Sequence, residues 1–287
     1  MKESITLNSG WKLDWTEFRG HTTKPRDGKG RMDAVVPGDV HLDLMRAGLI
    51  PDPFVGMNTD ACLWMEQKDW WLCREFDTPA GLAGRRAVLV FHGLDNFATV
   101  WVNGQVLGQS ANMFIRHEFD VTAALKPAGV NQLVVRLAAP AHSVKIDPDH
   151  KGIPIWSPER LFCRKPQMSF GWDIAPRLVT TGIWRPVELV LVDGARISDF
   201  RVALQRFDGP DAVVRVDVEV ECFEPGPGRL KGSVHGVAWE QPIELKPGKS
   251  VVSRELVLKK APRWWLIGYG KPALIEAAVS LEAAGRP

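Results

Sequence analysis

Residues 99–107 constrain the fold more strongly than any other stretch of the sequence. They read TVWVNGQVL, so two runs of β-branched, aromatic and aliphatic residues flank the pair Asn103 and Gly104. Asn and Gly both tolerate the positive φ angles of a type I′ turn, and such a pair between apolar runs predicts a β-hairpin. The chain is therefore expected to contain antiparallel sheet.

Strand-like segments recur along the rest of the sequence. Residues 214–220 alternate valine with charged residues, which is typical of an antiparallel strand with one face exposed. The other β-prone runs up to residue 192 are 5–18, 70–72, 86–92, 119–122, 132–137 and 187–192, and beyond residue 195 they are 201–204, 232–237, 251–258 and 274–281. A turn is expected at residues 225–228. Strands at this spacing in the last 90 or so residues predict an immunoglobulin-like sandwich after a boundary near residues 193–195.

One helix is expected, over residues 40–47. Asp39 is a suitable N-cap and Gly48 suits the C′ position. Residues 21–31 and 50–65 are expected to form loops, and residues 139–169 a long excursion rich in proline. The sequence thus predicts an all-β protein of two domains.

Composition excludes several classes of protein. A net charge of +2 with both signs mixed along the chain gives no reason to expect a nucleic-acid or membrane partner. The first ten residues lack an apolar signal core, and no apolar run approaches the length of a membrane span, so a cytoplasmic location is expected. The four cysteines lack CxxC spacing and the seven histidines lack metal-ligand spacing, so we expect reduced thiols, no metal and no cofactor.

Residues 170–189 are the candidate functional stretch. They read FGWDIAPRLVTTGIWRPVEL, a loop rich in Trp, Gly and Pro that carries Asp173 and Arg177. An indole face can hold the C–H side of a sugar ring, and charged groups can bind its hydroxyls. The alternative is a structural plug, in which Trp172 and Trp184 are core and Asp173 pairs with Arg177.

Motifs of the common catalytic sites are missing from the sequence. It contains no GxxxxGK[ST], HExxH or GxSxG. Glycoside hydrolysis needs two carboxyl groups at a fixed separation. Four acids lie beside aromatic residues, and the sequence does not show whether any two of them meet. They are Glu66, Asp69, Glu159 and Asp173.

Several motifs in the same order resemble the N-terminal region of β-mannosidases. They are residues 36–58, the pair Asp69-Trp70, residues 91–114 and residues 170–189. These enzymes belong to the glycoside hydrolase family that also contains β-galactosidases and β-glucuronidases. Residues 262–274, PRWWLIGYGKPAL, resemble the segment that closes the second domain in that family.

The resemblance implies a particular architecture. It implies a jelly-roll, galactose-binding-like sugar-binding domain over residues 1–193 and an immunoglobulin-like sandwich over residues 195–287. In the family a (β/α)8 barrel follows and carries both catalytic glutamates at the ends of its strands. That barrel is absent from this chain. We therefore expect no catalytic residue here, and we expect the barrel of the same full-length protein as the partner.

The resemblance also implies substrate-binding residues. The FGWD loop of the family reaches the mouth of the barrel, so Asp173 would accept hydrogen bonds from the terminal mannose and Trp172 would stand beside it. The loop around Asn58 would be a second approach to the sugar. The family usually has Trp and Gly where this chain has Ile174 and Ala175.

Three functions follow for testing. The first is the non-catalytic N-terminal part of a retaining exo-glycosidase that removes terminal β-D-mannosyl residues from β-mannosides or manno-oligosaccharides when joined to its barrel. The second is a stand-alone carbohydrate-binding β-sandwich without hydrolytic activity. The third is a structural or interaction role for the second domain.

Overall fold

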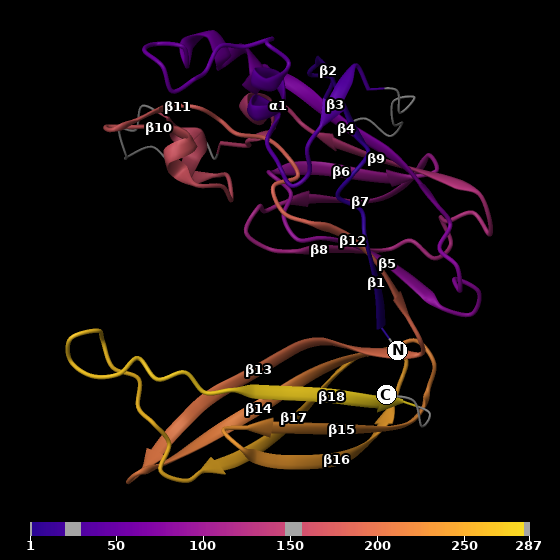
Figure 1. Cartoon of the computed structure of the whole chain (residues 1–287), viewed down its shortest axis with the longest axis vertical. Coiled ribbons are helices and arrows are strands. Elements are labelled where there is room, and N and C mark those ends of the chain that lie inside the picture. The colour runs from indigo at the N-terminus through magenta and orange to yellow at the C-terminus, as the bar shows by residue number, and fades with distance from the viewer. Residues whose placement is uncertain (1, 21–29, 147–156, 284–287) are drawn as a thin grey trace. The chain divides into compact units, whose positions relative to one another are not determined.

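The computed structural model describes residues 2–20, 30–146 and 157–283. Contacts between Cα atoms divide the chain into a first unit, residues 4–191, and a second unit, residues 192–287 with the first three residues (Figure 1). This division lies close to the boundary expected near residues 193–195. Most of the loop expected at 21–31, and residues 147–156 of the expected excursion, lie outside the described residues.

Two sheets build the first unit. The six-stranded sheet has the order β3 (Met32–Ala34), β2 (Trp11–Glu17), β4 (Lys68–Asp77), β9 (Val130–Leu137), β6 (Phe97–Val102) and β7 (Gln105–Ala111). The four-stranded sheet has the order β1 (Lys2–Thr6), β12 (Val187–Val192), β5 (Arg86–Phe91) and β8 (His117–Asp120). Alternate residues of both sheets, such as Leu133 and Leu189, are buried in one apolar cluster. The unit is therefore a β-sandwich, as the sequence predicts.

The hairpin expected at residues 99–107 is confirmed. Strands β6 and β7 pair antiparallel, with Val102 opposite Gln105. Asn103 and Gly104 form the turn between them with φ angles of 49° and 82°. The left-handed conformation of both residues is the one a type I′ turn requires.

The expected helix is also confirmed, and the structure contains further helical segments that the sequence analysis does not predict. Helix α1 spans Val40–Arg46, and the Asp39 carboxylate accepts a hydrogen bond of 2.8 Å from the His41 amide. Part of the loop expected at residues 50–65 is instead a 3-10 helix, η1 (Asp60–Gln67). Three further short helices lie in the expected excursion: α2 (Pro140–Ser143), η2 (Pro158–Leu161) and η3 (Gln167–Ser169).

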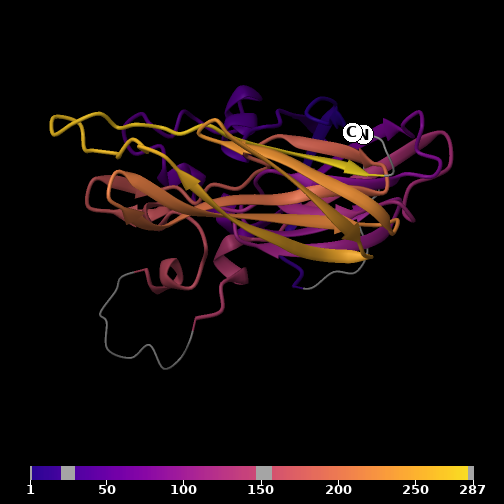
Figure 2. The same ribbon diagram turned by 90° about the horizontal axis from the view of Figure 1, so that it is seen from below.

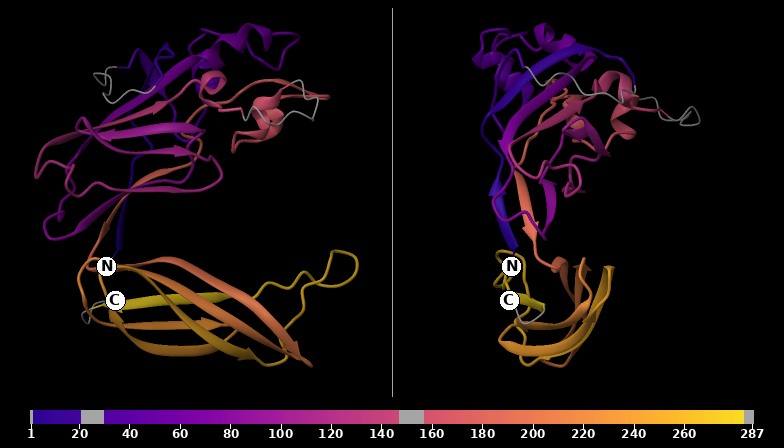
Figure 3. Two further views of the ribbon diagram at one scale, coloured as in Figure 1. Left: turned by 180° about the vertical axis from the view of Figure 1, so that it is seen from behind. Right: turned by 90° about the vertical axis from the view of Figure 1, so that its right-hand side faces the viewer.

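A small two-stranded hairpin extends from the first unit. It consists of β10 (Phe170–Trp172) and β11 (Ala175–Arg177), paired antiparallel with Trp172 opposite Ala175. The hairpin lies next to η3, and the loop that leads into η1 is near it in two views (Figures 1 and 3). This hairpin carries the acid that the sequence singled out.

The second unit is a sandwich of two three-stranded antiparallel sheets. One sheet has the order β13 (Ala195–Asp208), β14 (Asp211–Cys222) and β17 (Gly248–Leu258), and the other β16 (Val237–Leu245), β15 (Gly226–Val234) and β18 (Ala277–Ala283). The valines of β14 are buried between the sheets, which confirms the alternation at 214–220. The all-β fold class is thus confirmed.

Two local expectations in the second unit are wrong. The strand expected at residues 232–237 is interrupted by a turn at His235 and Gly236, whose φ angles are 49° and 76°. The turn expected at 225–228 gives way to strand β15, which begins at Gly226. Pro227 is the second residue of β15, and proline is tolerated near the start of a strand, so the sequence PGPG did not end the sheet.

Candidate functional site

Asp173 lies at the tip of the β10–β11 hairpin. Asp173 and Ile174 form the turn between the paired residues Trp172 and Ala175. Asp173 is exposed, Ile174 is 96% exposed and Trp172 is 47% exposed. Trp172 is therefore not part of the core of the first unit.

Arg177 fixes the base of this hairpin. Its Nε donates to both carboxylate oxygens of Glu66 at 3.0 and 3.2 Å, and its Nη1 donates to Glu159 at 2.8 Å. Nη1 also donates to the Ser157 hydroxyl at 2.9 Å and to the carbonyl of Phe170 at 3.3 Å. Arg177 thus ties β11 to η1 and η2, and its partners are Glu66 and Glu159 in place of the Asp173 that the plug alternative required.

The electrostatics of this cluster favour the charged forms of Arg177 and Glu159. Burial by itself lowers the pKa of Arg177, but the hydrogen bonds that it donates to Glu66 and Glu159 outweigh burial and raise that pKa above its usual value. Burial raises the pKa of Glu159, but hydrogen bonds to its own backbone amide and to Arg177 hold that pKa below its usual value. Glu66 and Glu159, two of the acids singled out by sequence, therefore act as a brace, because both bind the Arg177 guanidinium.

Trp172 is held on one side by a second arginine. The guanidinium carbon of Arg160 lies 4.5 Å from the centre of the Trp172 ring. This stacking orients the indole, and the ring is still half exposed. The sequence analysis did not identify Arg160, because the contact depends on how η2 packs on the hairpin.

Asn58 is half-buried in the loop that leads into η1. Its side-chain amide donates to the carbonyl of Asp52 at 2.9 Å, so it closes its own loop. The described part of the chain shows no hydrogen bond between Asn58 and the hairpin; the two are linked only through η1, whose Glu66 binds Arg177. The structure therefore brings Asp173 and Trp172 together at one tip and places Asn58 on a neighbouring loop.

Asp69 is a structural acid. It is 1% exposed, lies 2.7 Å from the Arg136 guanidinium and accepts a hydrogen bond of 2.9 Å from the Ala139 amide. Of the four acids that the sequence singled out, Asp173 is the one whose carboxylate has no hydrogen bond or ion pair within the described residues.

Metal and membrane chemistry find no support in the described residues. Within the described ranges, no group of three or more His, Cys, Asp or Glu side chains is placed to bind a metal ion. The helices described here are also too short or too polar for one of them to span a membrane. All four cysteines are free thiols, as the sequence predicts, and all four are buried.

Comparisons with known proteins identify similar sequences and folds. The family described as "Glycosyl hydrolase 2 galactose-binding domain-like" matches residues 15–185. "Beta-mannosidase B" of Thermothelomyces thermophilus is 40% identical over 291 residues, which cover 97% of this chain and 32% of that protein. The same-named protein of Aspergillus fumigatus is 34% identical over 289 residues, covering 97% and 33%. The chain spans about a third of the length of these curated relatives.

Solved structures agree with this likeness. The crystal structure of β-D-mannosidase from Dictyoglomus thermophilum matches with a TM-score of 0.83 and 33% identity, over 98% of this chain and 34% of that one. A putative β-galactosidase from Bacteroides fragilis matches with a TM-score of 0.67 and 20% identity, over 99% of this chain and 39% of that one. The second match concerns the fold alone. Both matches extend over a galactose-binding-like domain and the sandwich strands that follow it.

Proposed function

This chain belongs to the glycosyl hydrolase 2 galactose-binding domain-like family and is homologous to the N-terminal region of β-mannosidases, and from this we propose that it is the non-catalytic N-terminal portion of a retaining exo-glycosidase. In this proposal the complete enzyme removes terminal β-D-mannosyl residues from β-mannosides or manno-oligosaccharides. The nucleophile and the general acid would lie on a (β/α)8 barrel outside the 287 residues.

The observation that carries the proposal is the exposed carboxylate of Asp173 on a braced hairpin. A carboxylate is a strong acceptor for sugar hydroxyls, and the half-exposed ring of Trp172 offers an apolar face beside it. A substrate contact needs a rigid support, because a misplaced group loses most of its effect. The bonds from Arg177 to Glu66 and Glu159 supply such a support.

Exposed apolar side chains support the presence of a protein partner. In the segment 262–276 of the second unit, Ile267 is 87%, Tyr269 83% and Leu274 91% exposed. This segment extends beyond the strands of its unit (Figure 2). In the first unit, Phe54 is 80% and Met57 74% exposed. Large exposed apolar groups gathered on one segment mark interaction surfaces, and the proposed partner is the barrel of the longer protein.

Hydrolysis of an aryl β-mannoside tests the proposal. The 287-residue chain should not catalyse it. In a protein that joins this chain to its barrel, Asp173→Asn should lower kcat/KM by about 10- to 100-fold, because a charged hydrogen bond to the sugar is lost. Asp77→Asn changes another exposed acid, at the far end of β4, and should leave kcat/KM unchanged.

Two results would contradict the proposal. One is turnover that co-purifies with the 287-residue chain and disappears in Asp173→Ala, since the chain would then carry its own catalytic group. The other is an unchanged kcat/KM for Asp173→Asn in the complete protein. The cytoplasmic location expected from the sequence stays a prediction, and fractionation of cells that produce the protein would test it.

A stand-alone carbohydrate-binding module is the second candidate. Its support is a pocket in the first unit that does not include the hairpin. Calorimetric titration of the chain with mannose and manno-oligosaccharides separates the candidates: a dissociation constant below the millimolar range without a barrel favours the module, because half a subsite should bind poorly.

A further inference from the structure

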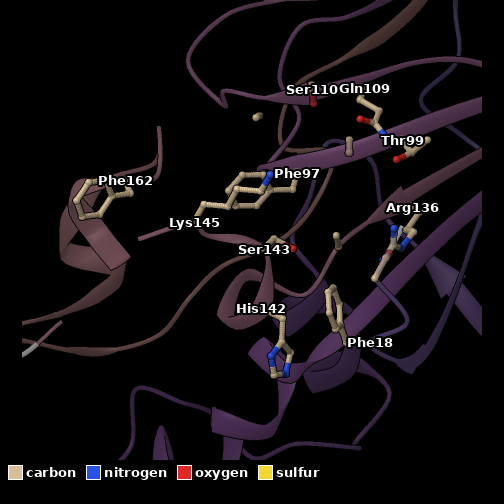
Figure 4. Close-up of a pocket in the computed structure, with 14 residues that line it drawn as sticks. Phe18, Phe97, Thr99, Gln109, Ser110, Arg136, His142, Ser143, Lys145 and Phe162 are labelled. Atoms are coloured by element: carbon tan, nitrogen blue, oxygen red, sulfur yellow. The ribbon is translucent and has the colours of Figure 1, made fainter. Parts of the chain in front are cut away.

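A pocket of about 510 Å³ lies on the outer face of the six-stranded sheet of the first unit (Figure 4). Strand register explains its floor. Thr99 of β6 pairs with Gln109 of β7 on one side and with Arg136 of β9 on the other, so three polar residues form one row across three strands. Directly paired residues share a face of the sheet. Phe97 and Ala111 form the next row, which is apolar.

Aromatic side chains line the sides of the pocket. Phe18, which follows β2, and His142 of α2 stack with ring centres 4.8 Å apart and an angle of 24° between the rings. Figure 4 shows this pair on one side of Phe97, and Thr99 and Gln109 on the other. The pocket therefore offers ring faces on one side and polar groups on the opposite side.

Arg136 supplies donors without adding net charge. Its side chain is 5% exposed, and its Nε and Nη2 donate to Asp69, with a further bond from Nη2 to the carbonyl of Gly20. No hydrogen bond among the described residues uses Nη1, whose two N–H groups are the donors we assign to a ligand. Asp69 balances the charge of Arg136. Among the described residues that line the pocket there is no carboxylate, and Lys145 is the one lysine.

We propose that this pocket binds a neutral saccharide unit. Sugar rings present apolar C–H faces to aromatic rings and hydroxyl groups to amides, hydroxyls and guanidinium N–H groups, and the pocket holds both kinds of partner on opposite sides. A charge-compensated arginine suits a hydroxyl better than an anion. The volume is within the range of small-molecule sites. This inference gives the second candidate function its binding site, and it is independent of the first candidate, because neither Asp173, Trp172 nor Asn58 lines the pocket.

Amide NMR titration of the 287-residue chain tests the proposal, with mannobiose and cellobiose as neutral probes and D-glucuronate as the anionic probe. Neutral disaccharides should shift the side-chain amide of Gln109 and the backbone amides of β6 and β7. Gln109→Ala should weaken binding about 5- to 10-fold, because one hydrogen-bonding group is lost. Ala111→Trp should abolish binding by filling the pocket, while the exposed positions of both residues favour correct folding.

Matched variants separate this site from others. Gln105→Ala changes an exposed glutamine on the same strand that does not line the pocket, and it should leave binding unchanged. Asp173→Asn should also leave it unchanged, so this test is independent of the proposed function. Unperturbed amide shifts outside the pocket would show that the variants fold.

Three outcomes would overturn the proposal. One is the absence of shifts around the pocket at saccharide concentrations in the tens of millimolar. The second is binding that Ala111→Trp leaves intact or that Asp173→Asn removes, which would place the saccharide elsewhere. The third is tighter binding of D-glucuronate than of the neutral disaccharides, since Lys145 would then select an anion.

Discussion

Replacing Lys165 by methionine is expected to destabilise the first unit strongly. The Lys165 side chain is 1% exposed and that of its partner Asp95 is 4% exposed. The Lys165 ammonium also donates to the carbonyl and the hydroxyl of Thr180, at 2.9 and 2.6 Å, and the Thr180 hydroxyl donates to Asp95 at 2.8 Å. Methionine has a similar length and no charge. Lys165→Met therefore leaves the Asp95 carboxylate buried with one hydroxyl as its hydrogen-bond partner.

Lys165→Met should lower the free energy of unfolding of the first unit by about 3–5 kcal/mol at mildly alkaline pH. This is the range found when one member of a buried ion pair is removed. Burial raises the pKa of Asp95 above its usual value in the native protein, and Lys165 and Thr180 partly oppose this rise. Without Lys165 the folded-state pKa rises further. A carboxyl with a raised folded-state pKa takes up its proton in the folded state first, so folding is favoured as pH falls through that pKa. The loss should therefore shrink in mildly acidic solution.

Hydrogen exchange of β5, β6 and β9, combined with urea unfolding, measures the stability of the first unit alone. The double variant Asp95→Asn/Lys165→Met should recover more than half of the loss, because no charge stays buried. Lys12→Met removes an exposed lysine, 51% exposed and paired with Asp33, and should change stability by less than about 1 kcal/mol. A loss below about 1 kcal/mol for Lys165→Met, or one that grows on acidification, would refute the reasoning.

Three further predictions concern the hairpin, the second unit and the thiols. Arg177→Gln removes the ion pairs with Glu66 and Glu159 and should increase the mobility of a nitroxide attached at position 174, measured by electron paramagnetic resonance. Arg177→Lys should increase this mobility less. An unchanged spectrum would contradict the bracing role. Gly232→Ala should destabilise the second unit by about 1–3 kcal/mol in urea unfolding, because the added Cβ would lie 2.5 Å from the ring of Trp239; wild-type stability would be the opposing result. Burial raises the pKa of the Cys163 thiol to about 11, so Ellman's reagent should label it only after unfolding, and rapid labelling of the native chain would speak against its burial.

Three local signals in the sequence predicted the structure correctly. The turn at Asn103 and Gly104 and the N-cap at Asp39 each depend on neighbouring residues, and the structure shows both. The alternation at 214–220 likewise predicts that the valine side chains are buried, as they are in the structure. The expectation of an unbroken strand at residues 232–237 was wrong. The chain turns at His235, which has a positive φ angle, and a histidine is a weak sequence signal for such a turn.

By itself, then, the sequence determined the all-β class, the main hairpin, the helix after Asp39 and, through its motifs, the family, and it singled out Asp173 without showing that this acid is exposed. Only the tertiary structure decided which acids are braces and where a pocket forms. Arg177 meets a glutamate 111 positions away, and the polar row through Thr99 exists only because β6 lies between β7 and β9. Such contacts depend on strand order and on the packing of separate segments, and neither is encoded in the period or turn chemistry of any single segment.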